Sequence, residues 1–244
     1  MKQSIFKILT NEPIAKEVYK MTLQGDCSDI TKSGQFVNIK LEGFYLRRPI
    51  SVCEVEGDIL TIIYKVVGKG TDAMSKMGKD TELDILTGLG NGYTLDQSGE
   101  KPLLVGGGVG VPPMYELAKR LVKDGKQVSV IIGFNKAEEI FYEAEFRALG
   151  CEVYVATADG SVGTKGFVTH VMKNLEDYTY VYACGPEPML KAVWSEAKTS
   201  GQFSFEERMG CGFGACMGCS CKTKYGNKRI CKEGPILVKE EIIW

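Results

Sequence analysis

The first hundred residues alternate between short apolar segments and turns rich in glycine and aspartate. Each segment mixes β-branched and aromatic residues with polar ones, which is typical of strands that bury one face. The expected strands cover Ser4 to Leu9, Val18 to Leu23, Gln35 to Leu41, Ile50 to Glu54 and Ile59 to Val67. Many short strands at close spacing predict an antiparallel β-barrel or sandwich over residues 1–100.

From residue 101 the pattern changes to apolar strands that alternate with amphipathic helices. The expected strands are Pro102 to Val105, Val128 to Phe134, Glu152 to Thr157 and Tyr180 to Cys184. The expected helices are Pro112 to Val122, Ala137 to Leu149, Phe167 to Leu175 and Pro188 to Thr199. This alternation predicts an α/β unit over residues 101–204, with a parallel sheet that binds ligands at the carboxyl ends of its strands.

The last 40 residues, 205–244, are rich in glycine and cysteine and show neither period. A segment this short cannot build a hydrophobic core of its own, so we expect a metal centre to organise it.

Composition excludes several classes of protein. The 244 residues are 44% hydrophobic and 25% charged, which is the globular average and argues against disorder. Thirty basic residues against 31 acidic ones leave a net charge of −1, so we expect neither nucleic acid nor a membrane surface as partner. The only histidine, His170, excludes a Rieske centre and any multi-histidine zinc enzyme.

The chain contains nine cysteines, an odd number that cannot pair completely as disulfides. The first ten residues, MKQSIFKILT, lack the apolar core of a signal peptide, and no apolar run is long enough to span a bilayer. These features favour a reducing cytoplasm, where clustered cysteines usually hold metal or carry out redox chemistry.

Three of the cysteines, Cys211, Cys216 and Cys219, have CxxxxCxxC spacing, and Cys231 follows after eleven intervening residues. This spacing is that of plant-type [2Fe–2S] loops, in which glycines let the backbone wrap the cluster. The alternative is a structural zinc site, which also takes four thiolates but more often shows two CxxC pairs. We expect Cys221 not to be a ligand.

Two separate motifs in the first hundred residues together could hold a flavin dinucleotide. Arg48 could contact the pyrophosphate, and Ser51, two residues after Pro49, could lie at the edge of the flavin ring. Gly70 and Thr71 open an expected helix from Asp72 to Met77, and free amides at a helix start suit phosphate oxygens. Read alone, residues 47–51 could equally be an ordinary basic turn.

A glycine-rich turn follows the first strand of the α/β unit. Gly106, Gly107, Gly108 and Gly110 precede a helix, although they do not form the GxGxxG fingerprint. The glycines would let a pyrophosphate or a nicotinamide approach the backbone; the alternative is a tight turn with no ligand.

A second motif ends the fourth predicted strand, where a nicotinamide would meet a flavin. It comprises Cys184, Gly185, Pro186 and Glu187. A small buried hydrophobic residue is the alternative interpretation of Cys184.

Taken together, these motifs resemble the ferredoxin reductase superfamily, with RxxS ahead of GxGT, then GGGxGxxP and CGPxPM. The continuation ERMGCGxGAC resembles the electron-transfer subunits of class 1B dihydroorotate dehydrogenases. The resemblance implies FAD contacts from two segments, Arg48, Pro49, Ile50 and Ser51 in one, and Ile63, Tyr64 and Lys65 in the other, in addition to Gly70 and Thr71. It also implies cluster ligation by Cys211, Cys216, Cys219 and Cys231. Position 65 is lysine where an arginine is expected, so a point charge replaces a bidentate fork.

The chemistry of the carriers predicts their order. Nicotinamide exchanges a hydride, whereas a [2Fe–2S] cluster passes one electron, so FAD is expected between NAD and the cluster. Ser51 is expected to tune the reactive flavin nitrogen. Cys184, with Gly185 and Glu187, is expected to orient the nicotinamide. Acidic residues after the second and third strands, among them Glu139 and Asp159, favour NAD over NADP.

The resemblance implies an oxidoreductase subunit of pyrimidine biosynthesis. Electrons would leave dihydroorotate at FMN in a partner subunit, within a heterotetramer, and would cross the cluster and FAD to NAD⁺. A dihydroorotate-oxidising barrel needs about 250 residues, and this chain has no room for one. Two alternatives remain: a flavin/iron–sulfur reductase for a sulfide, hydrogenase or oxygenase system, and a zinc-tailed nucleotide sensor without enzymatic activity.

Overall fold

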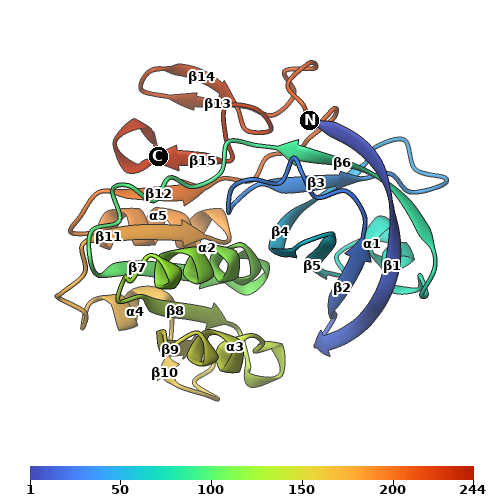
Figure 1. The fold of residues 1–244 in the computed structure, drawn as a ribbon. Helices are drawn as coiled ribbons and strands as arrows, with labels where there is room; N and C mark the ends of the chain where they lie inside the picture. The colour runs from blue at the N-terminus through green and yellow to red at the C-terminus, as the bar shows by residue number, and fades with distance from the viewer.

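The computed structural model describes all 244 residues, and the chain begins with a closed barrel (Figure 1). The barrel strands are β1 (Lys2–Ala15), β2 (Val18–Gln24), β3 (Phe36–Ile39), β4 (Arg48–Glu56), β5 (Ile59–Lys65) and β6 (Glu82–Leu89). Their order is β1-β2-β5-β4-β3-β6, and every paired strand is antiparallel. Closure leaves the barrel without a free edge.

The barrel interior is filled by the apolar residues that alternate along its strands. Val37, Leu60, Ile62 and Ile85 are fully buried there. A short helix, α1 (Lys69–Ser75), packs Met74 against the same core. This confirms the antiparallel barrel that the sequence pattern predicts.

One barrel strand, β6, is missing from the strands that the sequence predicts. Leu83 and Ile85 alternate with polar residues as a half-buried strand requires. Four glycines between residues 78 and 92, one inside β6 and another directly after it, make this stretch resemble turns. The pairing of β6 with both β1 and β3 closes the barrel and therefore overrides the local glycine signal.

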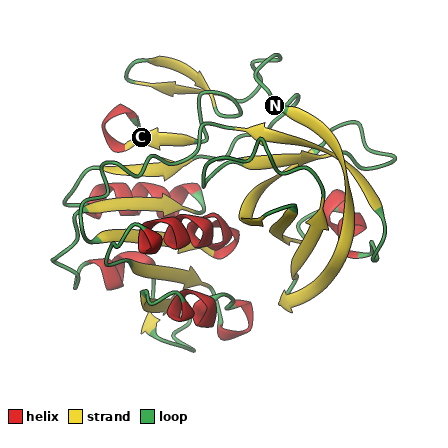
Figure 2. Cartoon of the chain, in the orientation of Figure 1, coloured by secondary structure: helices red, strands yellow, loops and turns green.

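The second half of the chain forms a seven-stranded sheet with helices on both faces (Figure 2). The strands are β7 (Pro102–Gly107), β8 (Ser129–Phe134), β9 (Glu152–Thr157), β10 (Thr164–Lys165), β11 (Tyr180–Cys184), β12 (Gly201–Ser204) and β15 (Ile236–Val238). The helices are α2 (Val111–Lys123), α3 (Glu143–Ala148), α4 (Val168–Met172) and α5 (Glu187–Glu196). The order β10-β9-β8-β7-β11-β12-β15 is parallel except for the last pair, so the predicted parallel sheet is confirmed.

The predicted helix Ala137 to Leu149 is wrong over its first half. The structure has a 3-10 turn (Ala137–Glu139), then a break, then α3. At the break Tyr142 adopts a left-handed conformation with φ 66°, which an α-helix does not allow. Both Phe141 and Tyr142 are buried in the core, and their packing overrides the helical propensity of the surrounding residues.

The two faces of the sheet bury different cores. Helices α2 and α3 cover one face, and this core also includes Val18, Cys53 and Ile63 of the barrel. Helices α4 and α5 cover the other face. The first of these cores therefore extends from the sheet into the barrel. None of the helices combines the length and apolar character needed to cross a membrane.

The residues after Ser204 are not a separate appendage. They form a hairpin of β13 (Ser220–Thr223) and β14 (Gly226–Arg229), then β15, which adds an antiparallel edge strand to the sheet beside β12, and a final 3-10 turn (Lys239–Glu241). Cys219, Ile230 and Cys231 are buried in the core that α4 and α5 cover. The segment is too short to form a hydrophobic core of its own, and its apolar residues are buried against the sheet instead.

Candidate functional site

Two of the predicted iron ligands, Cys211 and Cys216, lie side by side in what we call the cluster loop, residues 211–219. The Cys211 N–H points to the Cys216 Sγ at 3.5 Å, and the Cys216 N–H donates to the Cys211 Sγ at 3.4 Å. The Ala215 N–H also donates to the Cys211 Sγ at 3.2 Å. Burial opposes ionisation of Cys211, but these backbone donors outweigh it and lower the pKa of the thiol to about 6. The loop is therefore prepared to present a thiolate.

The other two predicted ligands form a buried pair. The Sγ atoms of Cys219 and Cys231 are 3.2 Å apart, and each residue is 2% exposed. The Cys231 N–H donates to the Cys219 Sγ at 3.4 Å. Burial, followed by the neighbouring Cys219 thiol, raises the pKa of Cys231 to about 12. Without a metal the Cys231 thiol is therefore neutral.

This arrangement of the four thiols fits two irons better than one zinc ion. A single tetrahedral zinc would hold all four sulfurs roughly 3.8 Å from one another. The structure instead pairs Cys211 with Cys216 and Cys219 with Cys231, and no group of three or more potential ligands converges on one point. Two pairs of thiolates are what a two-iron cluster requires. Cys221 lies apart on β13, half-buried.

Glycines bring the cluster loop close to its neighbours. A Cβ on Gly210 would lie 3.2 Å from the Cys216 Sγ. Gly212 has φ +79°, and a Cβ there would lie 2.2 Å from the amide nitrogen of Asn38 on β3. That nitrogen donates to the Cys211 carbonyl at 3.3 Å. The barrel therefore holds the first cysteine directly, through a residue that the sequence motifs did not single out.

The structure brings Arg48 and Gly70 together, as the flavin hypothesis requires. A Cβ on Gly70 would lie 2.1 Å from the Arg48 Nε, so only glycine leaves room for the guanidinium at the start of α1. The guanidinium also lies 4.5 Å from the centre of the Phe44 ring and donates to the Leu46 carbonyl. Arg48 is thus held at the barrel surface with its guanidinium against the start of α1.

The remaining residues of the flavin motifs have different surroundings. The Thr71 hydroxyl accepts the N–H groups of Val67 and Gly68 at 3.0 and 3.3 Å, so it closes the turn that precedes α1. Tyr64 is 2% exposed and donates to Asn11 at 2.9 Å, and Ile63 belongs to the core shared with the sheet. Both residues are buried, so their contact with a flavin stays a prediction.

A first cavity, of about 160 Å³, lies where the barrel, the sheet and the last segment of the chain meet. Pro49 and Ser51 line it from β4 of the barrel. Ser204, Phe205, Glu206 and Met209 line it from the end of β12 onward. Met209 stands two residues before Cys211, so this cavity reaches from Ser51 to the foot of the cluster loop.

A second and larger cavity, of about 620 Å³, lies at the carboxyl ends of the parallel strands. Its lining includes Gly107, Gly108, Gly110, Gly185, Pro186 and Lys65. Parallel sheets bind nucleotides at this edge, and the volume suits a ligand of that size. Cys184, Gly106 and Glu187 line neither of these two cavities.

The glycines of the turn after β7 have two separate tasks. Gly108 has φ +53°, and a Cβ there would have no heavy atom within 4 Å, so it leaves the cavity wall open. Gly110 instead permits tight packing, because a Cβ there would lie 2.2 Å from the Cys184 carbonyl oxygen. Cys184 itself is 3% exposed, and burial, followed by the charge of Glu206, raises its pKa to about 12. The Cys184 thiol is therefore neutral and anchors the end of β11.

Glu206 is a site residue that the motifs did not reveal. It lines both cavities, and burial raises the pKa of its carboxyl group. Its place just after the parallel strand β12 is the signal that could have identified it, because that edge of the sheet carries the ligand. Lys65 and Glu139 form an ion pair of 3.5 Å across the mouth of the larger cavity, between the barrel and the sheet.

Two protein-family models match the chain. Residues 104–195 match the model described as an oxidoreductase NAD-binding domain. Residues 206–243 match the iron–sulfur cluster binding domain of dihydroorotate dehydrogenase B. The first range contains the glycines that line the larger cavity. The second contains Cys211, Cys216, Cys219 and Cys231.

Close relatives span almost the whole chain. A dihydroorotate dehydrogenase B (NAD(+)) electron transfer subunit from Fusobacterium nucleatum subsp. nucleatum is 45% identical over 95% of both chains. One from Geobacillus sp. is 43% identical over 100% of this chain and 99% of the relative.

Solved structures agree with these relatives. A chain of the NADH-dependent reduced ferredoxin-NADP oxidoreductase superposes with a TM-score of 0.90 at 30% identity, covering 98% of this chain and 90% of that one. A ferredoxin NADP+ reductase from Neisseria gonorrhoeae with bound FAD and NADP has the same fold, with a TM-score of 0.70 at 19% identity over 80% of this chain and 90% of that one.

Proposed function

Because the chain belongs to the family of electron transfer subunits of dihydroorotate dehydrogenase B (NAD(+)), we propose that it passes electrons from a dihydroorotate-oxidising partner to NAD⁺. The protein is an NAD-linked oxidoreductase component whose cofactors are FAD, a [2Fe–2S] cluster and NAD. We further propose that the partner subunit carries FMN, that the two chains form a heterotetramer, and that the complex works in the cytoplasm. All nine cysteines are free thiols rather than disulfides, which favours a reducing compartment.

The observation that carries the proposal is the order of the three sites. The larger cavity and the smaller cavity share Glu206, and the smaller cavity extends to Met209 beside the cluster loop. In this proposal the nicotinamide, flavin and cluster sites therefore follow one another along the two cavities. Bound FAD exchanges a hydride with nicotinamide and single electrons with a [2Fe–2S] cluster, so it belongs in the middle.

Each group of residues has a separate task in this scheme. Arg48, beside Gly70, binds the pyrophosphate of FAD, and Ser51 faces the flavin ring from β4. The backbone of Ile63 and Tyr64 borders the flavin, while Lys65 and Glu139 stand at the mouth of the nucleotide cavity. Gly108 and Gly185 admit NAD to the wall of that cavity, and Cys184 orients the nicotinamide by fixing the end of β11. Cys211, Cys216, Cys219 and Cys231 bind the irons.

A co-purification with the catalytic chain tests the function. The two chains are expressed together, purified without oxygen, and treated with dihydroorotate or with NADH. We expect flavin and iron in the complex, and bleaching of the visible spectrum by either substrate. Bleaching by NADH without capture of the catalytic chain would indicate a reductase for another partner, and a colourless, iron-free protein would refute both.

Arg48→Ala is expected to weaken FAD binding roughly 10- to 100-fold, because hydrogen bonds to charged groups contribute about 1.5–3 kcal/mol. Equilibrium dialysis or flavin fluorescence measures the change. Arg48→Lys is the matched control and should lose less, since it keeps the charge but not the planar fork. Equal FAD affinity in the alanine variant and the wild type would refute the role of Arg48.

A further inference from the structure

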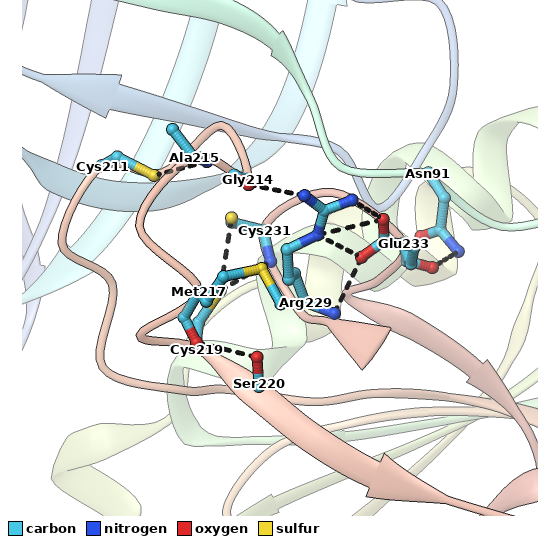
Figure 3. Close-up of polar contacts among 10 residues, drawn as sticks. All are labelled: Asn91, Cys211, Gly214, Ala215, Met217, Cys219, Ser220, Arg229, Cys231 and Glu233. Atoms are coloured by element: carbon cyan, nitrogen blue, oxygen red, sulfur yellow. Dashed lines mark hydrogen bonds and ion pairs between the residues drawn. The ribbon is translucent and has the colours of Figure 1, made fainter. Parts of the chain in front are cut away.

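Arg229, the last residue of β14, connects the cluster loop with the turn that carries Cys231 (Figure 3). We call residues 229–236 the closing turn. The Arg229 Nη1 donates to the Gly214 carbonyl at 2.6 Å, between Cys211 and Cys216. Its Nε donates to the Glu233 carboxylate at 2.9 Å, and its Nη2 makes a second bond to the same group. One planar side chain therefore binds the backbone of the cluster loop and a carboxylate of the closing turn.

The closing turn is itself anchored to the rest of the protein. The Asn91 side chain donates to the Glu233 and Ile236 carbonyls at 2.9 and 2.8 Å and accepts the Ile236 N–H at 3.1 Å. Asn91 lies in the connection between the barrel and the sheet. The contacts run without a break from Asn91 through the closing turn and Arg229 to Gly214.

The guanidinium also places a positive charge beside the buried thiol pair. The Arg229 side chain is 25% exposed, so water screens its charge only in part. Arg229 stands two residues before Cys231 in the sequence, and its ion pair with Glu233 offsets only part of its charge. A cluster with four thiolate ligands is anionic and becomes more so on reduction, so a nearby cation stabilises the reduced form.

We propose that Arg229 is a positioning residue that clamps the cluster loop to the closing turn and raises the reduction potential of the cluster. The inference rests on the proposed function, because it requires that Cys211, Cys216, Cys219 and Cys231 bind a cluster. The clamp depends on the fork of arginine, whereas the effect on the potential depends on charge alone. Substitutions can therefore separate the two effects.

The test compares Arg229→Lys, Arg229→Gln and a control, Lys222→Gln, with the wild type in the full complex. Lys222 is exposed on the neighbouring strand β13, so its replacement removes one positive charge from the same hairpin. Three quantities are measured: the rate of iron release to a chelator, the electron paramagnetic resonance spectrum of the reduced cluster, and its midpoint potential. FAD content reports whether the rest of the fold is intact.

Both arginine variants are expected to release iron roughly 10- to 100-fold faster than the control, the usual effect of losing an outer partner of a metal site. The potential should fall in Arg229→Gln and change little in Arg229→Lys. Iron release and potential equal to those of Lys222→Gln in both variants would overturn the inference.

Two further outcomes are informative. If Arg229→Gln does not accumulate, the Arg229→Lys variant alone tests the clamp. Iron release from Arg229→Lys at the rate of Lys222→Gln would then refute it. A wild-type complex without iron or FAD would instead refute the proposed function, before any variant is compared.

Discussion

Replacing Cys216 with serine is expected to abolish cluster binding and leave FAD in place. Cys216 is exposed at the tip of the cluster loop, and its sulfur accepts the Cys211 N–H. Loss of its thiolate leaves one iron of the pair with a single protein ligand from this loop. Arg48, Ser51 and Gly70, which we propose to contact FAD, lie on β4 and α1 of the barrel unit and are unaffected. We expect iron to fall from about two atoms per chain to near zero, with FAD unchanged, by metal analysis and flavin extraction.

The matched control is Cys221→Ser. Cys221 is two residues beyond Cys219, half-buried on β13 against the core, and its sulfur hydrogen-bonds to the Lys222 carbonyl at 3.7 Å. We expect this variant to keep both iron and FAD. A Cys216→Ser protein with full iron content, or a Cys221→Ser protein without iron, would show that the ligands are assigned incorrectly.

Gly110→Ala is expected to slow the reduction of FAD by NADH about 100-fold, the cost of misplacing reacting groups by about 1 Å. A Cβ at residue 110 would lie 2.2 Å from the Cys184 carbonyl oxygen and 2.6 Å from the Gly185 nitrogen. Both are backbone atoms, so the end of β11 must move away from the turn after β7. That movement displaces the cavity wall that would hold the nicotinamide. Stopped-flow absorbance of the flavin measures the rate.

Gly78→Ala serves as the control for the substitution itself. A Cβ at residue 78 would have no heavy atom within 4 Å, so the change should leave the rate as it is. FAD and iron contents should stay constant in both variants. An unchanged rate of flavin reduction in Gly110→Ala would show that packing of this turn against β11 does not position the nicotinamide.

The sequence predicts the parts of this fold that depend on local pattern. The alternation of strand and helix after residue 101 predicts the parallel sheet, and CxxxxCxxC spacing predicts an iron–sulfur loop that includes Cys211 and Cys216. The pairing of Cys219 with Cys231 is a long-range contact, made by a turn held through Asn91 and Arg229. Neither residue belongs to a motif: the Asn91 side chain contacts backbone atoms alone, and Arg229 contacts the Gly214 carbonyl and the Glu233 carboxylate.

Errors arose where long-range packing decides local conformation. β6 contains and borders glycines, and its pairing with β1 and β3 makes it a strand nonetheless. Burial of Phe141 and Tyr142 breaks a stretch that has helical propensity. Glu206 belongs to no sequence motif for a related reason. It borders two cavities, and neither cavity exists until the barrel and the sheet pack together.

Cys219 and Cys231 are buried in the core beneath α4 and α5. If they bind iron, the stability of the folded chain depends on the supply of iron. A ligand that binds only the folded state adds its binding free energy to the stability of that state. In a cell short of iron, newly made chains would lack the binding free energy of the cluster at this core. Such chains would unfold more often and be degraded by proteases. Iron limitation would then reduce the amount of this subunit as well as its activity.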